Sequence, residues 1–106
     1  MHIVNLTLHD VSFVLENGET VCVPASGKVA RLTTSTQIVG QIGNIPITET
    51  VFGQIENLPD PTEGEVYIVS SLVAGRVPDR QDVFIPNESI RDDAGRIIGC
   101  RSLGRI

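Results

Sequence analysis

The residues most suited to chemistry are two serines and two arginines in the stretch YIVSSLVAGRVPDR, residues 67–80. The apolar residues before Ser70 and Ser71 predict a short strand, and either serine can cap the helix that follows by accepting a hydrogen bond from one of its first amides. The start of a helix has amides without internal partners and the positive end of the helix dipole, so it favours a phosphate. The sequence therefore predicts an anion site at this strand-to-helix junction. The alternative is an ordinary capped helix that packs on the core.

The second part of the predicted site is a cation that complements these amides. Arg76 and Arg80 follow the serines but lie toward the opposite end of the helix, so Arg31, Arg101 or an arginine of a second subunit must supply it. Seven of the eight basic residues are arginine, whose guanidinium suits bidentate capture of phosphate or carboxylate. The alternative for each arginine is an ion pair within the chain. The aromatic side chains that could stack on a base are Phe52, Tyr67 and Phe84. The candidate ligand-binding residues are Arg31, Ser70, Ser71, Arg76, Arg80, Arg101 and Phe84.

Other kinds of site have weaker support. Ser70 and Ser71 lack the Gly-x-Ser-x-Gly elbow of serine hydrolases, and no residue places His9 as their base. His2 and His9 lack the spacing of zinc ligands. Asp92 and Asp93 precede Ala-Gly, which is typical of a turn. We therefore expect a protein that is not an enzyme and that uses no metal and no cofactor.

The charge and the hydropathy exclude several partners. The formal net charge is -5, whereas a protein that binds long nucleic acid needs a basic surface. The basic residues are concentrated late, with six arginines against five acids in residues 76–106 and only Lys28 and Arg31 against eight acids before them. No apolar run approaches the ~18 residues of a membrane span, and the N-terminus lacks a charged region followed by an apolar signal core. We expect a cytoplasmic protein that binds neither membranes nor long nucleic acid, in which Cys22 and Cys100 are small buried hydrophobic residues.

The elements that must position the candidate residues are short strands separated by frequent turn signals. We expect about eight short strands and one or two short helices in one domain, residues 1–106, which gives a mainly β (α+β) fold with a small antiparallel sheet or a barrel-like form. Asn17-Gly18 predicts a hairpin with a type I′ turn between Val11–Leu15 and Thr20–Val23. Gly43-Asn44 predicts a second turn, between strands at 38–42 and 45–52. With three Phe, one Tyr and no Trp, the core is modest, so we expect a homo-oligomer.

The second half of the chain contains clear signals for loops and for the ends of strands. Residues 57–64 contain two prolines and a final glycine and predict a loop. A strand follows at Glu65–Val69, and then the helix, which Pro78 limits to about two turns. We expect a strand at Asp82–Ile85 that Pro86 stops, and a last strand at Arg96–Leu103 after a turn.

Five strings of residues span nearly the full length: NLTLH at 5–9, PASGKVARL at 24–32, YIVSSLVA at 67–74, RQDVFIP at 80–86 and DDAGRIIGCRSL at 92–103. On these strings the chain resembles a group of small proteins encoded by bacteriophages and prophages, mostly without assigned function. Leu8 stands where that pattern has proline, and no catalytic residue can be carried over. The resemblance implies a phage or prophage product that acts in the host bacterial cytoplasm. By analogy with small phage proteins that counter host defence, it implies a sponge for nucleotide second messengers.

Two functions from different classes follow. The first is a non-enzymatic, oligomeric module that captures a small anionic ligand, such as a cyclic or ADP-ribose-type nucleotide. The alternative is a protein-interaction module or minor structural component that binds a host or virion protein through a sheet edge or an apolar patch. A hydrolase is the third possibility.

Overall fold

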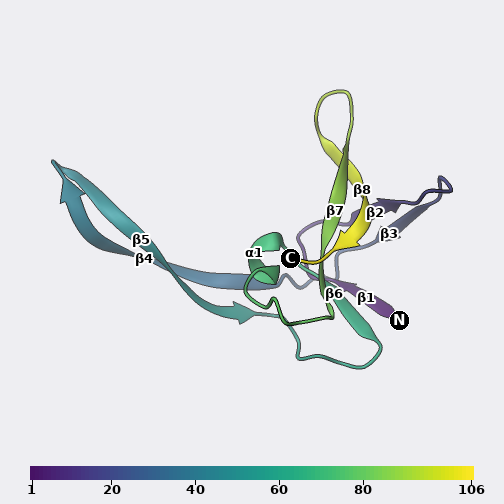
Figure 1. Ribbon diagram of the computed structural model, residues 1–106, viewed down its shortest axis with the longest axis horizontal. Helices are drawn as coiled ribbons and strands as arrows, with labels where there is room; N and C mark the ends of the chain where they lie inside the picture. Colours follow the sequence, from purple (N-terminus) through teal and green to yellow (C-terminus); the bar gives the residue numbers. More distant parts are fainter.

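The computed structural model describes residues 1–106 and consists of a β-rich body and a long projecting arm (Figure 1). The body contains β1 (His2–Asn5), β2 (Val11–Val14), β3 (Thr20–Val23), β6 (Glu65–Ile68), β7 (Val83–Arg91) and β8 (Ile97–Gly104). The arm is the hairpin of β4 (Arg31–Ile42) and β5 (Ile45–Glu56), and the helix is α1 (Ser71–Ala74). The mainly β fold and the eight strands confirm the prediction from sequence.

The six body strands form one sheet in the order β1-β6-β7-β8-β2-β3. A bridge between Asn5 and Ala25 brings the β1 edge to the segment after β3, so the sheet is nearly closed and barrel-like. The expectation of an antiparallel sheet is wrong in part, because β1–β6, β6–β7 and β2–β8 are parallel pairs. Parallel neighbours need a crossover connection, and the segment that contains α1 supplies it between β6 and β7.

The core lies on both faces of β6, which is a central strand of this sheet. Tyr67 and Val69 pack in a cluster with Val73 of α1, while Ile68 packs in a second cluster with Phe13. Successive side chains of a strand point to opposite faces, so one apolar run serves both clusters. The second face holds the buried Cys100, whereas Cys22 is exposed, contrary to expectation, because it lies on the edge strand β3.

The β2–β3 hairpin confirms the predicted strands but not the turn type. Only Gly18 has a positive φ, of 87°, whereas a type I′ turn requires positive φ at both central residues. The Gly18 amide donates to the Leu15 carbonyl at 3.0 Å, and the Leu15 amide donates to the Glu19 carbonyl at 2.8 Å. The loop is therefore one residue longer than the two-residue loop of a type I′ turn, and Gly18 takes the left-handed conformation that closes it.

Two element lengths differ from the sequence prediction. The α1 helix has a single turn, Ser71–Ala74, and Gly75 is its C-terminal cap. The chain then continues in turns, one of which is closed by the hydrogen bond from the Val77 amide to the Ala74 carbonyl. Pro86 does not stop β7. The strand β6, which pairs with β7 on one side, ends at Ile68 opposite Phe84. Beyond that point β7 has a neighbouring strand only on its other side, which is β8. A proline is tolerated on such an open edge.

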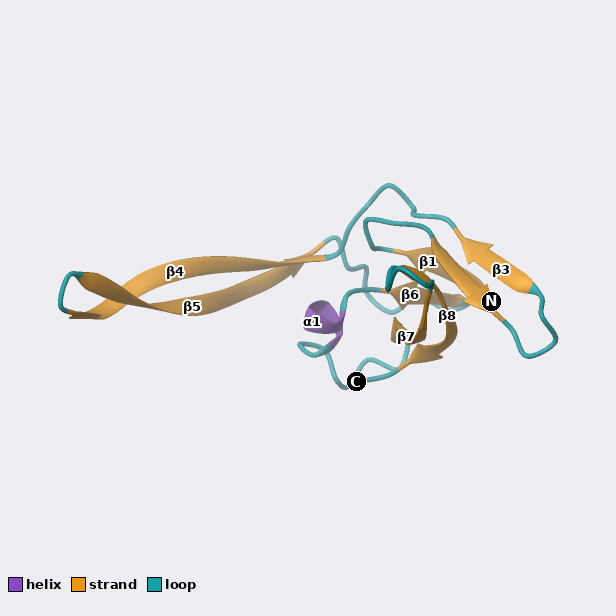
Figure 2. Cartoon of the chain, turned by 90° about the horizontal axis from the view of Figure 1, so that it is seen from above, coloured by secondary structure: helices purple, strands orange, loops and turns teal.

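The arm is longer than predicted. Its register runs from Arg31 opposite Glu56 to Ile42 opposite Ile45, so residues 33–36, which could have ended the strand, continue it. Figure 2 shows the arm leading away from the body with no other element beside it. The molecule is therefore extended, with principal dimensions of 58 × 40 × 24 Å.

Candidate functional site

The base of the arm brings two of the predicted ligand-binding residues together. Arg31, the first residue of β4, and Ser70, which precedes α1, line one open hollow of about 370 Å³. The register of the arm fixes Arg31 there, and the crossover after β6 fixes Ser70. Leu72 and Leu8 contribute apolar lining to the same hollow. Of the two candidate arginines, Arg31 is therefore the one that shares a hollow with Ser70.

A second open hollow, of about 330 Å³, lies on the other side of Leu72. Ser71 and Arg76 line it from the helix segment, and Phe52 lines it from β5. The Arg76 guanidinium lies over the Phe52 ring, 4.2 Å from its centroid. A one-turn helix is only about 6 Å long, so its two ends contribute to neighbouring hollows. We call these six residues the arm-base site: Arg31, Phe52, Ser70, Ser71, Leu72 and Arg76.

Ser70 confirms its predicted role as the helix cap. Its Oγ accepts a hydrogen bond from the Val73 amide at 3.4 Å, and its backbone is extended as a cap requires. This bond is long, and the Ser70 side chain is exposed beside Arg31. The sequence left Arg31, Arg101 and a second subunit open as the source of the cation, and in the structure Arg31 lines the hollow of Ser70.

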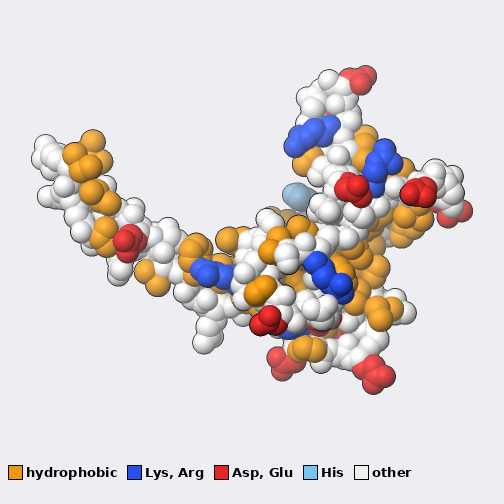
Figure 3. Space-filling model, in the orientation of Figure 1, with side chains coloured by type: hydrophobic (Ala, Val, Ile, Leu, Met, Phe, Trp, Pro, Cys, Tyr) orange, Lys and Arg blue, Asp and Glu red, His pale blue; other side chains and the backbone are white.

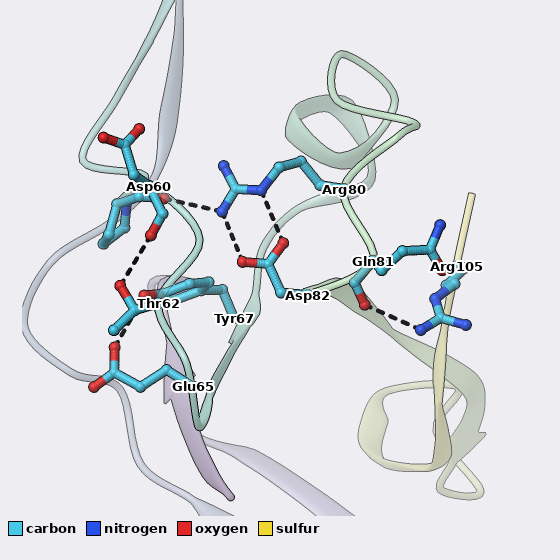
Figure 4. Close-up of polar contacts among 9 residues, drawn as sticks. Asp60, Thr62, Glu65, Tyr67, Arg80, Gln81, Asp82 and Arg105 are labelled. Atoms are coloured by element: carbon cyan, nitrogen blue, oxygen red, sulfur yellow. Dashed lines mark hydrogen bonds and ion pairs between the residues drawn. The ribbon is translucent and has the colours of Figure 1, made fainter.

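Arg80 is committed to an ion pair in the body. Its Nε and Nη2 donate to the two carboxylate oxygens of Asp82, both at 2.8 Å, and Nη2 also donates to the Pro59 carbonyl at 2.9 Å (Figure 4). The hydrogen bond from Arg80 holds the pKa of Asp82 below its ordinary value, and the same bond raises the pKa of Arg80. This pair fixes the loop after β5 to the start of β7, outside the arm-base site.

The other two candidates also lie away from the arm base. Phe84 of β7 is covered by Arg105, whose guanidinium lies 4.9 Å from the ring centroid and donates to the Gln81 carbonyl. Arg101 is an exposed residue of β8 and lines neither hollow of the arm base.

The arginines fall into two groups: those that make an ion pair or a hydrogen bond within the chain, and those that make neither. Arg80 and Arg96 form ion pairs, while Arg91 and Arg105 donate to backbone carbonyls. The arginines that make neither contact are Arg31, Arg76 and Arg101. Glu56 is the cross-strand neighbour of Arg31 but forms no ion pair with it. Two of the three available guanidiniums thus lie at the arm base.

The arm itself carries an exposed apolar surface that sequence analysis did not anticipate (Figure 3). Ile42 and Ile45 flank the tip turn with 71% and 70% of their surface exposed. From Leu32 to Ile55 the only charged residue is Glu49. The residues we call the apolar tip are Ile38, Val39, Ile42, Ile45 and Ile47, all of them exposed hydrophobic residues.

The body has two further hollows of about 460 Å³ each. One, beside β1 and β6, includes Lys28 and Glu65, and the Tyr67 hydroxyl donates to this carboxylate at 2.9 Å. The other, which we call the body groove, lies between β2 and β8 and is lined by exposed Ile97 and Ile98. Its remaining lining is His9, Asp10, Val11, Ser12, Pro86, Ser89, Gly99 and Cys100.

No three His, Cys, Asp or Glu side chains come together in a group that could hold a metal ion. The single helix is far from the length and apolar character needed to cross a membrane. Comparison with protein-family models, curated proteins and solved structures gives no match to this chain.

Proposed function

We propose that the protein is a non-enzymatic binding module that captures a small anionic ligand at the arm-base site. The observation that carries this proposal is the placement of Arg31 and Arg76. Both guanidiniums are free of acidic partners, and they flank Leu72 next to Ser70 and Ser71. A cation that is paired with a carboxylate must lose that partner to bind a ligand, whereas Arg31 has none and Arg76 has only its contact with the Phe52 ring.

The site chemistry favours a phosphorylated ligand with a planar group. Each guanidinium can donate two parallel hydrogen bonds to a phosphate. The serine hydroxyls add donors, and Phe52 offers a ring on which a base can stack beside Arg76. A cyclic or ADP-ribose-type nucleotide combines these features. With the resemblance to phage proteins, this supports a sponge that sequesters a nucleotide second messenger in the bacterial cytoplasm and so counters host defence.

Calorimetry at one fixed salt concentration tests the proposal with cyclic dinucleotides, cyclic ADP-ribose and inorganic phosphate. We expect binding of at least one nucleotide, weakened about 10- to 100-fold by Arg31→Gln or Arg76→Gln, since a charge-assisted hydrogen bond contributes about 1.5 to 3 kcal/mol. Arg101→Gln is the matched control, because it removes an equally free arginine from another part of the body. Absence of any binding tighter than about millimolar, or an equal loss in the control, would contradict the proposal.

Recovery of the ligand distinguishes capture from catalysis. We expect the bound nucleotide to be released unchanged on denaturation, as mass spectrometry would show. Conversion of the ligand during incubation, abolished by Arg31→Gln, would make the protein an enzyme instead.

A protein-interaction or minor structural role is the second candidate, and the exposed arm favours it. A single stoichiometric host or virion partner in pull-downs from infected cells would support it. That partner must be lost with Ile42→Asp at the arm tip and retained with Arg31→Gln at the arm base.

A further inference from the structure

The apolar tip and the body groove are two exposed apolar surfaces on one chain. Ile42 and Ile45 expose 71% and 70% of their surface, and Ile97 and Ile98 expose 60% and 59%. Soluble monomers rarely expose large apolar patches unless these bind something. The arm leads away from β2 and β8, so its tip does not reach the groove of its own chain (Figure 1).

We propose that the apolar tip of one copy docks in the body groove of a second copy. This single contact covers both surfaces, whereas pairing of two arms with each other would leave Ile97 and Ile98 exposed. The tip brings no charge into the groove, because the charged residues of the arm, Arg31, Glu49 and Glu56, all lie outside the apolar tip. The groove carries one acid, Asp10, whose Oδ1 already accepts from the Ala25 amide at 2.8 Å. No charge of the groove therefore needs a partner from the tip.

The sizes of the two surfaces match a stable assembly. About six residues of each strand form the tip half of the arm, which gives a ribbon about 20 Å long and about 10 Å wide, or about 400 Å² over its two faces. In a closed assembly each copy buries one tip and one groove, so it buries about 800 Å², the area per partner of a standard interface. Because each copy offers one tip and accepts one, the contact is head-to-tail: it gives a ring where the rotation between neighbouring copies closes and an open filament where it does not.

An isolated two-stranded ribbon gains from such a contact. A hairpin on its own is marginally stable in water, because its apolar faces stay hydrated. Docking covers the tip half, while the half between tip and base, which is rich in threonine but also exposes Val51 and Phe52, spans the gap between two bodies. The arm thus has the composition of a connector with an apolar end.

Native mass spectrometry and light scattering test the assembly. We expect wild type to be larger than one chain, and both Ile42→Asp and Ile98→Asp to give monomers. Val21→Asp is the matched control, since Val21 is an exposed hydrophobic residue of β3 outside both surfaces, and it should retain the wild-type mass. A monomeric wild type would overturn the inference, as would an Ile98→Asp protein that keeps the wild-type mass.

Cysteine cross-linking identifies which surfaces meet. In a Cys22→Ser background, which removes the exposed native thiol, Ile42→Cys and Ile98→Cys proteins are mixed, allowed to exchange and oxidised. We expect the mixed disulfide between the two variants. A disulfide that forms only between two Ile42→Cys chains, or no disulfide at all, would overturn the inference.

The test of the assembly and the test of the ligand site can fail independently of each other. Both mass and cross-linking are measured without ligand, on proteins that keep Arg31 and Arg76. An assembly that forms while calorimetry finds no nucleotide would remove the proposed function and leave this inference in place.

Discussion

The body and the arm use the same residue types in opposite ways. Ile68 of β6 is completely buried, whereas Ile45 at the arm tip is 70% exposed. Arg80 donates two hydrogen bonds to the Asp82 carboxylate in the body, whereas Arg31 at the arm base makes no such bond. The buried side chains and the ion pairs of the body thus have partners within the chain, although Ile97, Ile98 and Arg101 of β8 do not. The arm has no other element beside it, so most of its apolar side chains and Arg31 are free to contact a ligand or another protein.

Asn5 of the motif NLTLH is a buried polar residue of the body whose hydrogen bonds are all made within the chain. Asn5 is buried, and its Nδ2 donates to the Val23 and His9 carbonyls at 3.0 and 2.9 Å. Its Oδ1 accepts from the amide and the hydroxyl of Thr7. A buried amide needs such partners. Asn5 of this motif therefore has a structural role, whereas Leu8 of the same motif lines the hollow of Arg31 and Ser70.

The largest contrast is expected from one substitution made in both regions. Ile68→Ala removes a side chain that is completely buried, so we expect a loss of about 2 to 5 kcal/mol in the free energy of unfolding. Ile45→Ala should change it by less than about 0.5 kcal/mol. Denaturant unfolding of the monomeric Ile98→Asp background measures both without a contribution from association. Equal losses would mean that the arm packs on its own body.

The two classes of arginine give the next contrast. Arg80→Met leaves the Asp82 carboxylate, only 18% exposed, without its cation. We expect a loss of about 1.5 to 3 kcal/mol in the free energy of unfolding, the range for hydrogen bonds to charged groups. Arg31→Met should leave stability within about 0.5 kcal/mol of wild type. A comparable loss for Arg31→Met would assign that arginine to the fold and weaken its role as a ligand-binding residue.

The sequence predicts the features that depend on neighbouring residues. Strand alternation predicts eight strands, the two glycine turns predict the β2–β3 and β4–β5 hairpins, and Ser70 is predicted as a helix cap. The errors have local causes as well. Pro86 was expected to stop β7, but a proline is harmful only where the neighbouring strand needs its amide, and β6 has already ended there.

Features that depend on distant residues could not be predicted. Arg31 and Arg101 were equal candidates for the cation beside Ser70, because their proximity depends on how the arm leaves the body. The expected two-turn helix also separated Arg76 from the serines, whereas one turn brings Ser71 and Arg76 to one hollow. The exposure of the arm was missed because an apolar pattern predicts burial without stating which chain provides the cover.

The smallest contrast concerns acid. The hydrogen bond from Arg80 lowers the pKa of Asp82 in the folded protein, so the charged carboxylate stabilises the fold above its unfolded pKa of about 3.9. That contribution is lost as the pH falls through the lowered pKa, because protonation then occurs in both states. We expect the free energy of unfolding of Asp82→Asn to fall less than that of wild type between neutral and acidic pH, by about 1 kcal/mol or less. Glu49→Gln removes a carboxylate in the middle of β5 that forms no ion pair in the chain, and it should leave the acid profile unchanged. Chemical unfolding between neutral pH and the lowest pH at which the protein folds measures both profiles. A profile altered by Glu49→Gln in the monomeric background would show that the arm, like the body, depends on contacts within its own chain.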